Sequence, residues 1–303
     1  MFQFEFPTIE DRKWVQPFLS KSGNMGSESA FGTLFLWGDT YFSKICRFED
    51  YLLLCSGGHF HNYNLPVGGK NPYEAIEALI ADSRERNIPF AMWGLTQDGV
   101  AELQELFPGK FEFTLDRNAS DYIYTASDLI DLPGRRFHGK RNHLAQFQRS
   151  YDWSYEDITV ENIEDCRTVA KKWCEANGGC GKGNSAEGES CAISRAFRYF
   201  KELELSGGLI RIDGKPAAFT IGEEINPQTY LIHFEKALDG YNGLYPAINH
   251  EFASRCLQGY KYINREEDLG LEGLRKAKLS YHPVFLLQKY LATLKEESKE
   301  AVQ

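Results

Sequence analysis

Charged residues crowd one stretch near the end of this 303-residue chain, residues 263–283 (INREEDLGLEGLRKAKLSYHP). The stretch leaves a predicted strand at Asn264, is acidic first and basic afterwards, and turns at Gly270 and Gly273. In open α/β folds, ligands usually bind at loops that follow strands. Acidic and basic groups side by side suit a ligand with an amine and a phosphate, although a solvated charged loop has the same composition.

A histidine and a carboxylate stand two residues apart in the strand-like run YLIHFEKA. If the strand alternates regularly, His233 and Glu235 leave the same face. They would then serve as a base and the group that orients it, or lie on a half-exposed sheet face. A serine nucleophile is not indicated, because the sequence has no Gly-x-Ser-x-Gly elbow.

Basic residues gather in residues 133–149 of an otherwise acidic protein. This segment is predicted to start a helix, where backbone N–H groups and guanidinium groups together suit a phosphate. A solvated helix start between two domains is the alternative interpretation. The basic residues concerned are Arg135, Arg136, Lys140, Arg141 and Arg149.

Two further patterns do not meet the requirements of the sites that they suggest. Residues 177–190 are rich in glycine but lack the first glycine and the hydroxyl residue of a phosphate-binding P-loop, so we predict a surface loop. Cys174, Cys180 and Cys191 miss the close pairing that zinc ligands usually show. We therefore predict no metal site.

Strand-like and helix-like segments alternate along the chain, as in a mixed α/β (α+β) fold. Helices are predicted over residues 71–87, 96–109, 139–150, 161–177 and 245–258. Strands are predicted over 51–56, 89–95, 111–125 (two strands around a turn at Arg117-Asn118), 153–159, 207–237 (three strands, with a hairpin at Asp213-Gly214) and 260–264. The tail, 284–297, fits either a helix or a strand. These elements predict two halves that meet near residue 130 and share an interface.

Composition and charge limit the class of protein. Hydrophobic residues make up 42% and charged residues 25% of the chain, as in ordinary globular proteins. No apolar run approaches the roughly 18 residues that cross a bilayer, and the N-terminus does not read as a secretory signal, so we expect a cytoplasmic protein. The net charge of −9 lies almost entirely in residues 1–130. That argues against an indiscriminate nucleic-acid binder but permits a local basic patch.

Several segments in order resemble a known family. The chain is similar to the soluble C-terminal catalytic region of bacterial phosphatidylglycerol lysyltransferases and to stand-alone proteins of the same family. The matching segments are NLPVGG with the helix after it, DYIYTASDLIDLPGRRFHGKRNHLAQFQR and INREEDLGLEGLRKAKLSYHP. The last is also similar, more distantly, to a segment of peptidoglycan branching-peptide transferases.

The resemblance implies two tandem acetyltransferase-like domains of the Gcn5-related type, residues 1–130 and 131–303. Each would be a mixed, mostly antiparallel sheet flanked by helices. It also implies transfer of an aminoacyl group from aminoacyl-tRNA without a metal. The coenzyme A loop of acetyltransferases is degenerate at residues 240–245, although Gly243 ahead of Pro246 still allows a backbone cradle at a helix start.

We therefore expect an acyltransferase that moves an aminoacyl group from aminoacyl-tRNA to the amine or hydroxyl of a small molecule or peptide. The alternatives are an acyl-CoA-dependent N-acyltransferase and a non-catalytic module for an amino-acid-like or phosphate-bearing ligand. Catalysis would depend on positioning and on cations near the oxyanion. The predicted catalytic residues are Lys278 or Arg275 for that charge, Asp268 or Glu235 for the acceptor amine, and His233. The residues predicted to contact tRNA or substrate are Arg135, Arg136, Lys140, Arg141, Asn142, Gly243, Asn264, Arg265, Glu267 and Tyr281.

Overall fold

The computed structural model describes residues 1–58, 61–177 and 185–295. Of the predicted surface loop 177–190, residues 178–184 lie outside these ranges, and residues 185–190 belong to a helix rather than a loop. The strands are β1 (Lys44–Phe48), β2 (Tyr51–Ser56), β3 (Asn62–Tyr63), β4 (Val67–Gly68), β5 (Ala91–Leu95), β6 (Phe111–Thr125), β7 (Trp153–Asp157), β8 (Ser206–Ile212), β9 (Lys215–Asn226), β10 (Thr229–Ala237), β11 (Tyr262–Asn264) and β12 (Phe285–Leu294). Within the described ranges they form one sheet in the order β1-β2-β3-β5-β12-β6-β11-β10-β9-β8-β7, with β4 beside β2. Its pairs are antiparallel except β3 with β5 and β10 with β11.

Helices cover the two faces of this sheet. The α-helices are α1 (Arg12–Lys21), α2 (Phe31–Leu36), α3 (Gly38–Tyr41), α4 (Tyr73–Glu85), α5 (Gln97–Leu106), α6 (Ala126–Asp131), α7 (His138–Ser150), α8 (Ile163–Ala176), α9 (Ser185–Arg198), α10 (Leu244–Cys256) and α11 (Glu272–Leu279). Two short 3-10 helices, η1 (Ile9–Asp11) and η2 (Ser27–Ser29), precede α1 and α2. None of the helices in the described part of the chain is both long and apolar enough to cross a membrane.

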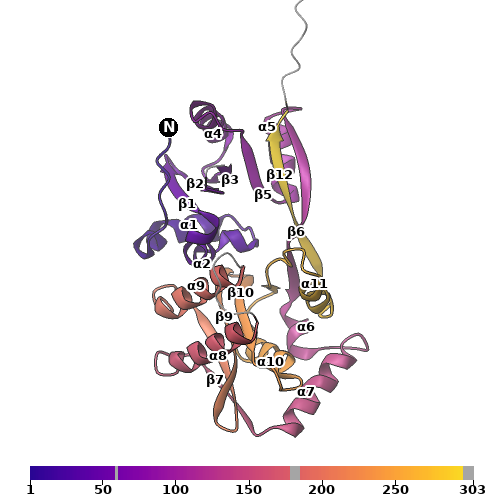
Figure 1. The fold of residues 1–303 in the computed structure, drawn as a ribbon. Coiled ribbons are helices and arrows are strands. Elements are labelled where there is room, and N and C mark those ends of the chain that lie inside the picture. Colours follow the sequence, from indigo (N-terminus) through magenta and orange to yellow (C-terminus); the bar gives the residue numbers. More distant parts are fainter. Residues whose placement is uncertain (59–60, 178–184, 296–303) are drawn as a thin grey trace, which may run out of the picture.

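Two strands join the halves of the molecule. Figure 1 shows β6 and β12 running side by side from one half to the other. The last strand, β12, lies between β5 and β6 and so completes the sheet of the first half. Its central position in the sheet explains why the ambiguous tail is a strand rather than a helix. The boundary near residue 130 stays a prediction, and residues 285–294 pair with strands on its N-terminal side.

One apolar core is shared between the halves. Val15, Phe31 and Leu52 from the first half pack in the same buried cluster as Phe219 and Phe234 from the second. Each of these five side chains is at most 2% exposed. Burying large apolar side chains is the dominant favourable term in folding, so this core holds the two halves together.

The predicted helices and most predicted strands are present, with two differences. Residues 111–125 form one strand rather than two, because residues 117–120 bulge out between the pairs Asp116↔Lys289 and Asp121↔Leu287. The charged stretch 263–283 is not a plain loop, since it contains α11. The hairpin at Asp213-Gly214 is confirmed, with both residues at positive φ.

Candidate functional site

The central feature of the site is the point where β10 and β11 part. They pair in parallel over three residues, as far as Leu231 and Asn264. Beyond Asn264 the chain stays on β6: Arg265 N–H donates to the Tyr122 carbonyl at 3.0 Å, and Tyr122 N–H donates to the Glu266 carbonyl at 3.1 Å. Residues 264–268, which we call the junction segment, therefore diverge from β10. Beyond Asn264, only side chains connect this segment with β10.

A bulge in β10 separates two residues that were predicted to act together. The pairing with β9 shifts between Ile232 and Phe234, so the regular alternation is broken at His233. His233 Nε2 lies 2.8 Å from Glu223 on β9, on the face covered by α2. Glu235 instead accepts a hydrogen bond at 3.1 Å from Asn249 of α10. The prediction that the two side chains share a face is wrong, because a local alternation rule cannot include a bulge.

His233 is held between two carboxylates on the α2 side of the junction segment. Its Nε2 contacts Glu223 at 2.8 Å and its Nδ1 contacts Glu266 at 3.3 Å. Burial alone would lower the pKa of His233, but the two carboxylates outweigh burial and raise it to about 9. The ring is thus positively charged near neutral pH. Gly32 makes room for this group, because a Cβ there would stand 2.1 Å from a Glu223 oxygen.

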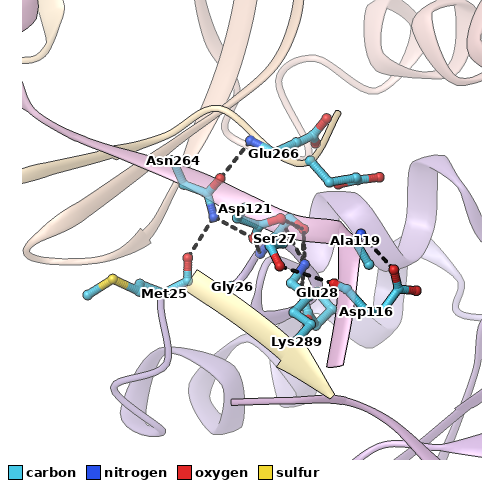
Figure 2. A network of polar contacts seen from close by, with 12 residues as sticks. Met25, Gly26, Ser27, Glu28, Asp116, Ala119, Asp121, Asn264, Glu266 and Lys289 are labelled. Atoms are coloured by element: carbon cyan, nitrogen blue, oxygen red, sulfur yellow. Dashed lines mark hydrogen bonds and ion pairs between the residues drawn. The ribbon is translucent and has the colours of Figure 1, made fainter. Parts of the chain in front are cut away.

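A buried polar network lies next to that ion pair (Figure 2). Lys289 Nζ on β12 donates to Asp121 at 2.8 Å and to Glu28 at 2.7 Å. Asn264 donates to Asp121 and to the Met25 carbonyl, both at 2.8 Å. Lys289 is 1% exposed, and Asp121 and Asn264 are fully buried. Asn264, predicted to contact substrate, therefore ties the junction segment to the first half.

Glu267 stands beside this network with its carboxylate unpaired. Burial, Glu266 and Asp121 raise the pKa of Glu267 to about 7, although Lys289 opposes them. Within the described ranges, its side chain accepts a hydrogen bond from its own backbone N–H but from no other residue, which is the sense of unpaired here. Such a carboxylate can accept and release a proton near neutral pH. Its position agrees with the predicted contact to substrate.

Lys278, on α11, reaches the same segment from the other end. Its ammonium donates to the carbonyl oxygens of Arg265, at 2.5 Å, and Glu267. Burial lowers the pKa of Lys278, while Glu266 and Glu267 oppose that shift. An ammonium has three N–H groups, so one remains without an acceptor among the residues described. A fixed N–H donor of this kind can stabilise an oxyanion.

Asp268 and Arg275 bind each other rather than standing free for substrate. Arg275 donates to both Asp268 oxygens, at 2.8 and 2.9 Å, and Tyr122 adds a third hydrogen bond at 2.5 Å. The hydrogen bonds from Arg275 hold the pKa of Asp268 well below its usual range. Asp268 is fully buried. The pair shapes the turn that presents Glu267 and Lys278, so its geometry fits a structural role.

A different cluster occupies the α10 side of the junction segment. Arg265 donates to Glu235 at 2.9 Å, and Glu235 also accepts from Asn249. Lys140 Nζ, from α7, lies 3.7 Å from the centre of the Tyr281 ring, and the Arg265 guanidinium lies 5.0 Å from the same centre. The structure therefore brings together four residues that the sequence named from three distant segments.

The other basic residues near α7 do not converge with Lys140. Arg136 pairs with a carboxylate of α6, and Arg141 donates to two carbonyls of the preceding turn. Asn142 contacts His138 one helical turn away, at 3.1 Å. Arg135 is exposed. Of the four basic residues predicted to contact tRNA, only Arg135 and Arg136 are exposed, as a contact with tRNA requires.

The start of α10 is closed by α7. Gly243 has φ of 82°, and a Cβ there would stand 2.6 Å from the His143 carbonyl of α7. Pro246 in the first turn has no N–H, and the Asn242 N–H already donates to Tyr151. Close helix packing accounts for Gly243, and the predicted backbone cradle offers few donors.

Other parts of the described chain offer no clear cofactor site. Within residues 1–58, 61–177 and 185–295, no three His, Cys, Asp or Glu side chains are placed to share a metal ion. Hollows of about 470 and 460 Å³ lie between α8 and α9 and beside the end of α1. Neither is lined by the junction segment, where the hydrogen-bonding and charged groups converge, so we place the candidate site at that segment.

Sequence reasoning missed the partners of the junction segment. Lys289 interrupts the strand-like apolar run 285–294, and a charge in such a run signals a buried pair. Asp121 follows the polar residues 116–120, so it carries a weaker signal. Glu28, Glu223 and Asn249 carry no comparable signal, because only the folded chain brings them to the site.

This chain is similar to known proteins in sequence and in fold. The sequence profile of the family "Phosphatidylglycerol lysyltransferase, C-terminal" matches residues 20–293. A conserved protein of unknown function from Bacteroides thetaiotaomicron VPI-5482 is 39% identical, with a TM-score of 0.92 over 97% of this chain and 100% of that one. L-PGS from Bacillus licheniformis is 16% identical, with a TM-score of 0.68 over 95% and 93%.

An uncharacterized protein of Mycoplasmoides gallisepticum is 21% identical over 181 residues. That match spans 58% of this chain and 57% of the relative. The predicted mixed α/β fold is confirmed, with a large, mostly antiparallel sheet flanked by helices. The chain belongs to the phosphatidylglycerol lysyltransferase C-terminal family.

Proposed function

We propose that this protein is an acyltransferase that moves an aminoacyl group from aminoacyl-tRNA to an amine or hydroxyl acceptor. One observation carries the proposal. Glu267, whose carboxylate is unpaired and whose pKa is about 7, is next to Lys278, whose ammonium is fixed by two carbonyls with one N–H to spare. A base and an oxyanion donor at one strand end are the two groups that acyl transfer needs.

The reaction would proceed by addition and elimination. The acceptor amine or hydroxyl attacks the ester carbonyl carbon and forms a new C–N or C–O bond, while its proton passes to Glu267. The carbonyl oxygen takes up the negative charge, which the remaining N–H of Lys278 stabilises. The intermediate then expels the ribose oxygen of tRNA. The proton held by Glu267 moves to that oxygen, so Glu267 returns to its starting state.

The surrounding network would act by positioning. Asn264 and Asp268 fix the two ends of the junction segment through buried hydrogen bonds with Asp121 and Tyr122. His233 holds Glu266, the neighbour of the proposed base. Preorganised groups of this kind need not rearrange as charge develops, so these residues affect rate through Glu267 and Lys278 rather than by contact with substrate.

Two observations support tRNA over coenzyme A as the donor. The start of α10 is packed against α7, and its first turn includes Pro246, which has no N–H to offer a pyrophosphate. Arg135 and Arg136 are exposed at the turn before α7, where they are available to tRNA phosphates. The resemblance of the chain to aminoacyl-transferring families points the same way.

The test is filter binding of a charged tRNA pool against the same pool deacylated, at low and moderate salt. Preference for the charged pool supports the proposal, because only recognition of the aminoacyl end distinguishes the two. Absence of binding, or salt-sensitive binding that ignores acylation, refutes it. Acetyl-CoA in a thermal-shift assay is the parallel arm: a raised Tm there would favour the acyl-CoA alternative.

A further inference from the structure

We propose that the α10 side of the junction segment contains a second site, which binds a phosphate group between Lys140 and Arg265. This site lies on the opposite side of the segment from Glu267. It does not depend on the proposed transfer reaction, because it rests on different residues.

The charges of this cluster do not balance. Two cations, Lys140 and Arg265, contact the ring of Tyr281, with Lys140 Nζ 3.7 Å and the Arg265 guanidinium 5.0 Å from its centre. One carboxylate, Glu235, lies beside them, and it is already paired with Arg265 at 2.9 Å. One positive charge is therefore left over in a half-buried setting, where an anion is the natural partner.

Hydrogen-bond donors in the cluster also lack acceptors. Arg265 Nη1 is buried without a partner, and Lys140 donates to no residue in the described part of the chain. Burial first, and Arg265 second, lower the pKa of Lys140 to about 8, as expected for an ammonium without its counter-ion. Its flexible four-carbon stem lets the ammonium turn from the ring to an incoming anion.

Asn249 narrows the ligand to a phosphate. Its NH₂ group must face Glu235, since a carboxylate only accepts, and this fixes the amide orientation. Its Oδ1 is then buried without a donor. The missing ligand should offer oxygens to Arg265 and Lys140 and one hydrogen to Asn249. Free phosphate has both near neutral pH, and a phosphate monoester has both in its singly protonated form, whereas a carboxylate or a phosphodiester has only acceptors.

The first test is isothermal titration of the full chain with inorganic phosphate at constant ionic strength. Acetate and dimethyl phosphate are the comparison probes, because neither has the O–H group. We expect phosphate to bind more tightly than both. Equal binding of the three, or no binding of phosphate, overturns the proposal. A subsequent titration with methyl phosphate distinguishes a site for free phosphate from one that accepts a monoester.

The second test compares two lysine variants. Lys140→Gln removes one charge-assisted hydrogen bond, so it should weaken phosphate binding about 10- to 100-fold. Lys201→Gln is the matched control, since Lys201 is exposed after α9 and should leave binding unchanged. Unchanged binding in Lys140→Gln, or an equal loss in Lys201→Gln, overturns the assignment. Failure of this test does not affect the charged-tRNA result, so the two proposals are tested independently.

Discussion

The two sides of the junction segment are opposite in charge and in what they leave unpaired. On the α2 side, five carboxylates lie near three basic side chains, Lys289, His233 and Lys278. The carboxylates belong to Glu28, Asp121, Glu223, Glu266 and Glu267. On the α10 side, Arg265 and Lys140 outnumber Glu235. The first side leaves acceptors unpaired, at Glu267 and one oxygen of Glu28. The second leaves donors unpaired.

Whether the unpaired groups are acceptors or donors predicts the function of each side. A buried polar group without a partner costs about 1–3 kcal/mol, so stability alone gives no reason to keep one. An unpaired carboxylate with a pKa near 7 suits proton transfer, whereas an unpaired guanidinium N–H and ammonium suit an anion. Variants that affect one side and spare the other therefore test this contrast.

The largest effect is expected at the base. Glu267→Gln removes the proton acceptor, so the rate of transfer should fall about 10²- to 10⁴-fold with little change in phosphate binding. Single-turnover transfer from charged tRNA measures the rate. Glu202→Gln, at an exposed position, is the matched control.

The pH profile gives an independent check on that base. Because Glu267 must be deprotonated to act and its pKa is about 7, the wild-type rate should rise as pH increases through about 7. The residual rate of Glu267→Gln should lack this rise. A variant as fast as wild type, or one that keeps the same profile, would exclude Glu267 as the base.

Next in size is the buried cation Lys289. Lys289→Met leaves Asp121 and Glu28 as uncompensated buried charges, so the free energy of unfolding should drop by about 3–5 kcal/mol. Urea denaturation measures the drop. Lys295→Met changes an exposed lysine on the same C-terminal segment and should have little effect. A small change at Lys289 would mean that the network contributes little to joining the halves.

Lys278 comes third. Lys278→Ala removes the proposed oxyanion donor, so turnover should fall about 10²- to 10³-fold, far more than acceptor affinity changes. Comparison of kcat with KM for the acceptor separates these effects. Lys276→Ala, at an exposed position of the same helix, controls for loss of a lysine from α11. Unchanged turnover would remove Lys278 from the mechanism.

The sequence predicted the elements better than it predicted the partners. Hydrophobic periodicity indicated helices such as α4, α5 and α8, and the order of motifs indicated the fold. The bulge at His233 was not predictable, because it depends on pairing with a strand that approaches through the fold. The sequence also did not predict that Glu267 is unpaired. Glu267 lacks a basic partner because Arg275 pairs with Asp268 and Lys289 pairs with Asp121.

The smallest effect is expected at Asp268, beside the point where the two sides meet. Asp268→Asn removes the charge that pairs with Arg275, which should lower the free energy of unfolding by about 1–3 kcal/mol. The pKa of Asp268 is depressed in the folded state, so its stabilisation is full above the unfolded value near 3.9 and is lost as pH falls below it. Unfolding curves of wild type and variant should therefore converge in acid. If the difference stayed constant down to low pH, the charge of Asp268 would not be what holds the turn, and the presentation of Glu267 would need another cause.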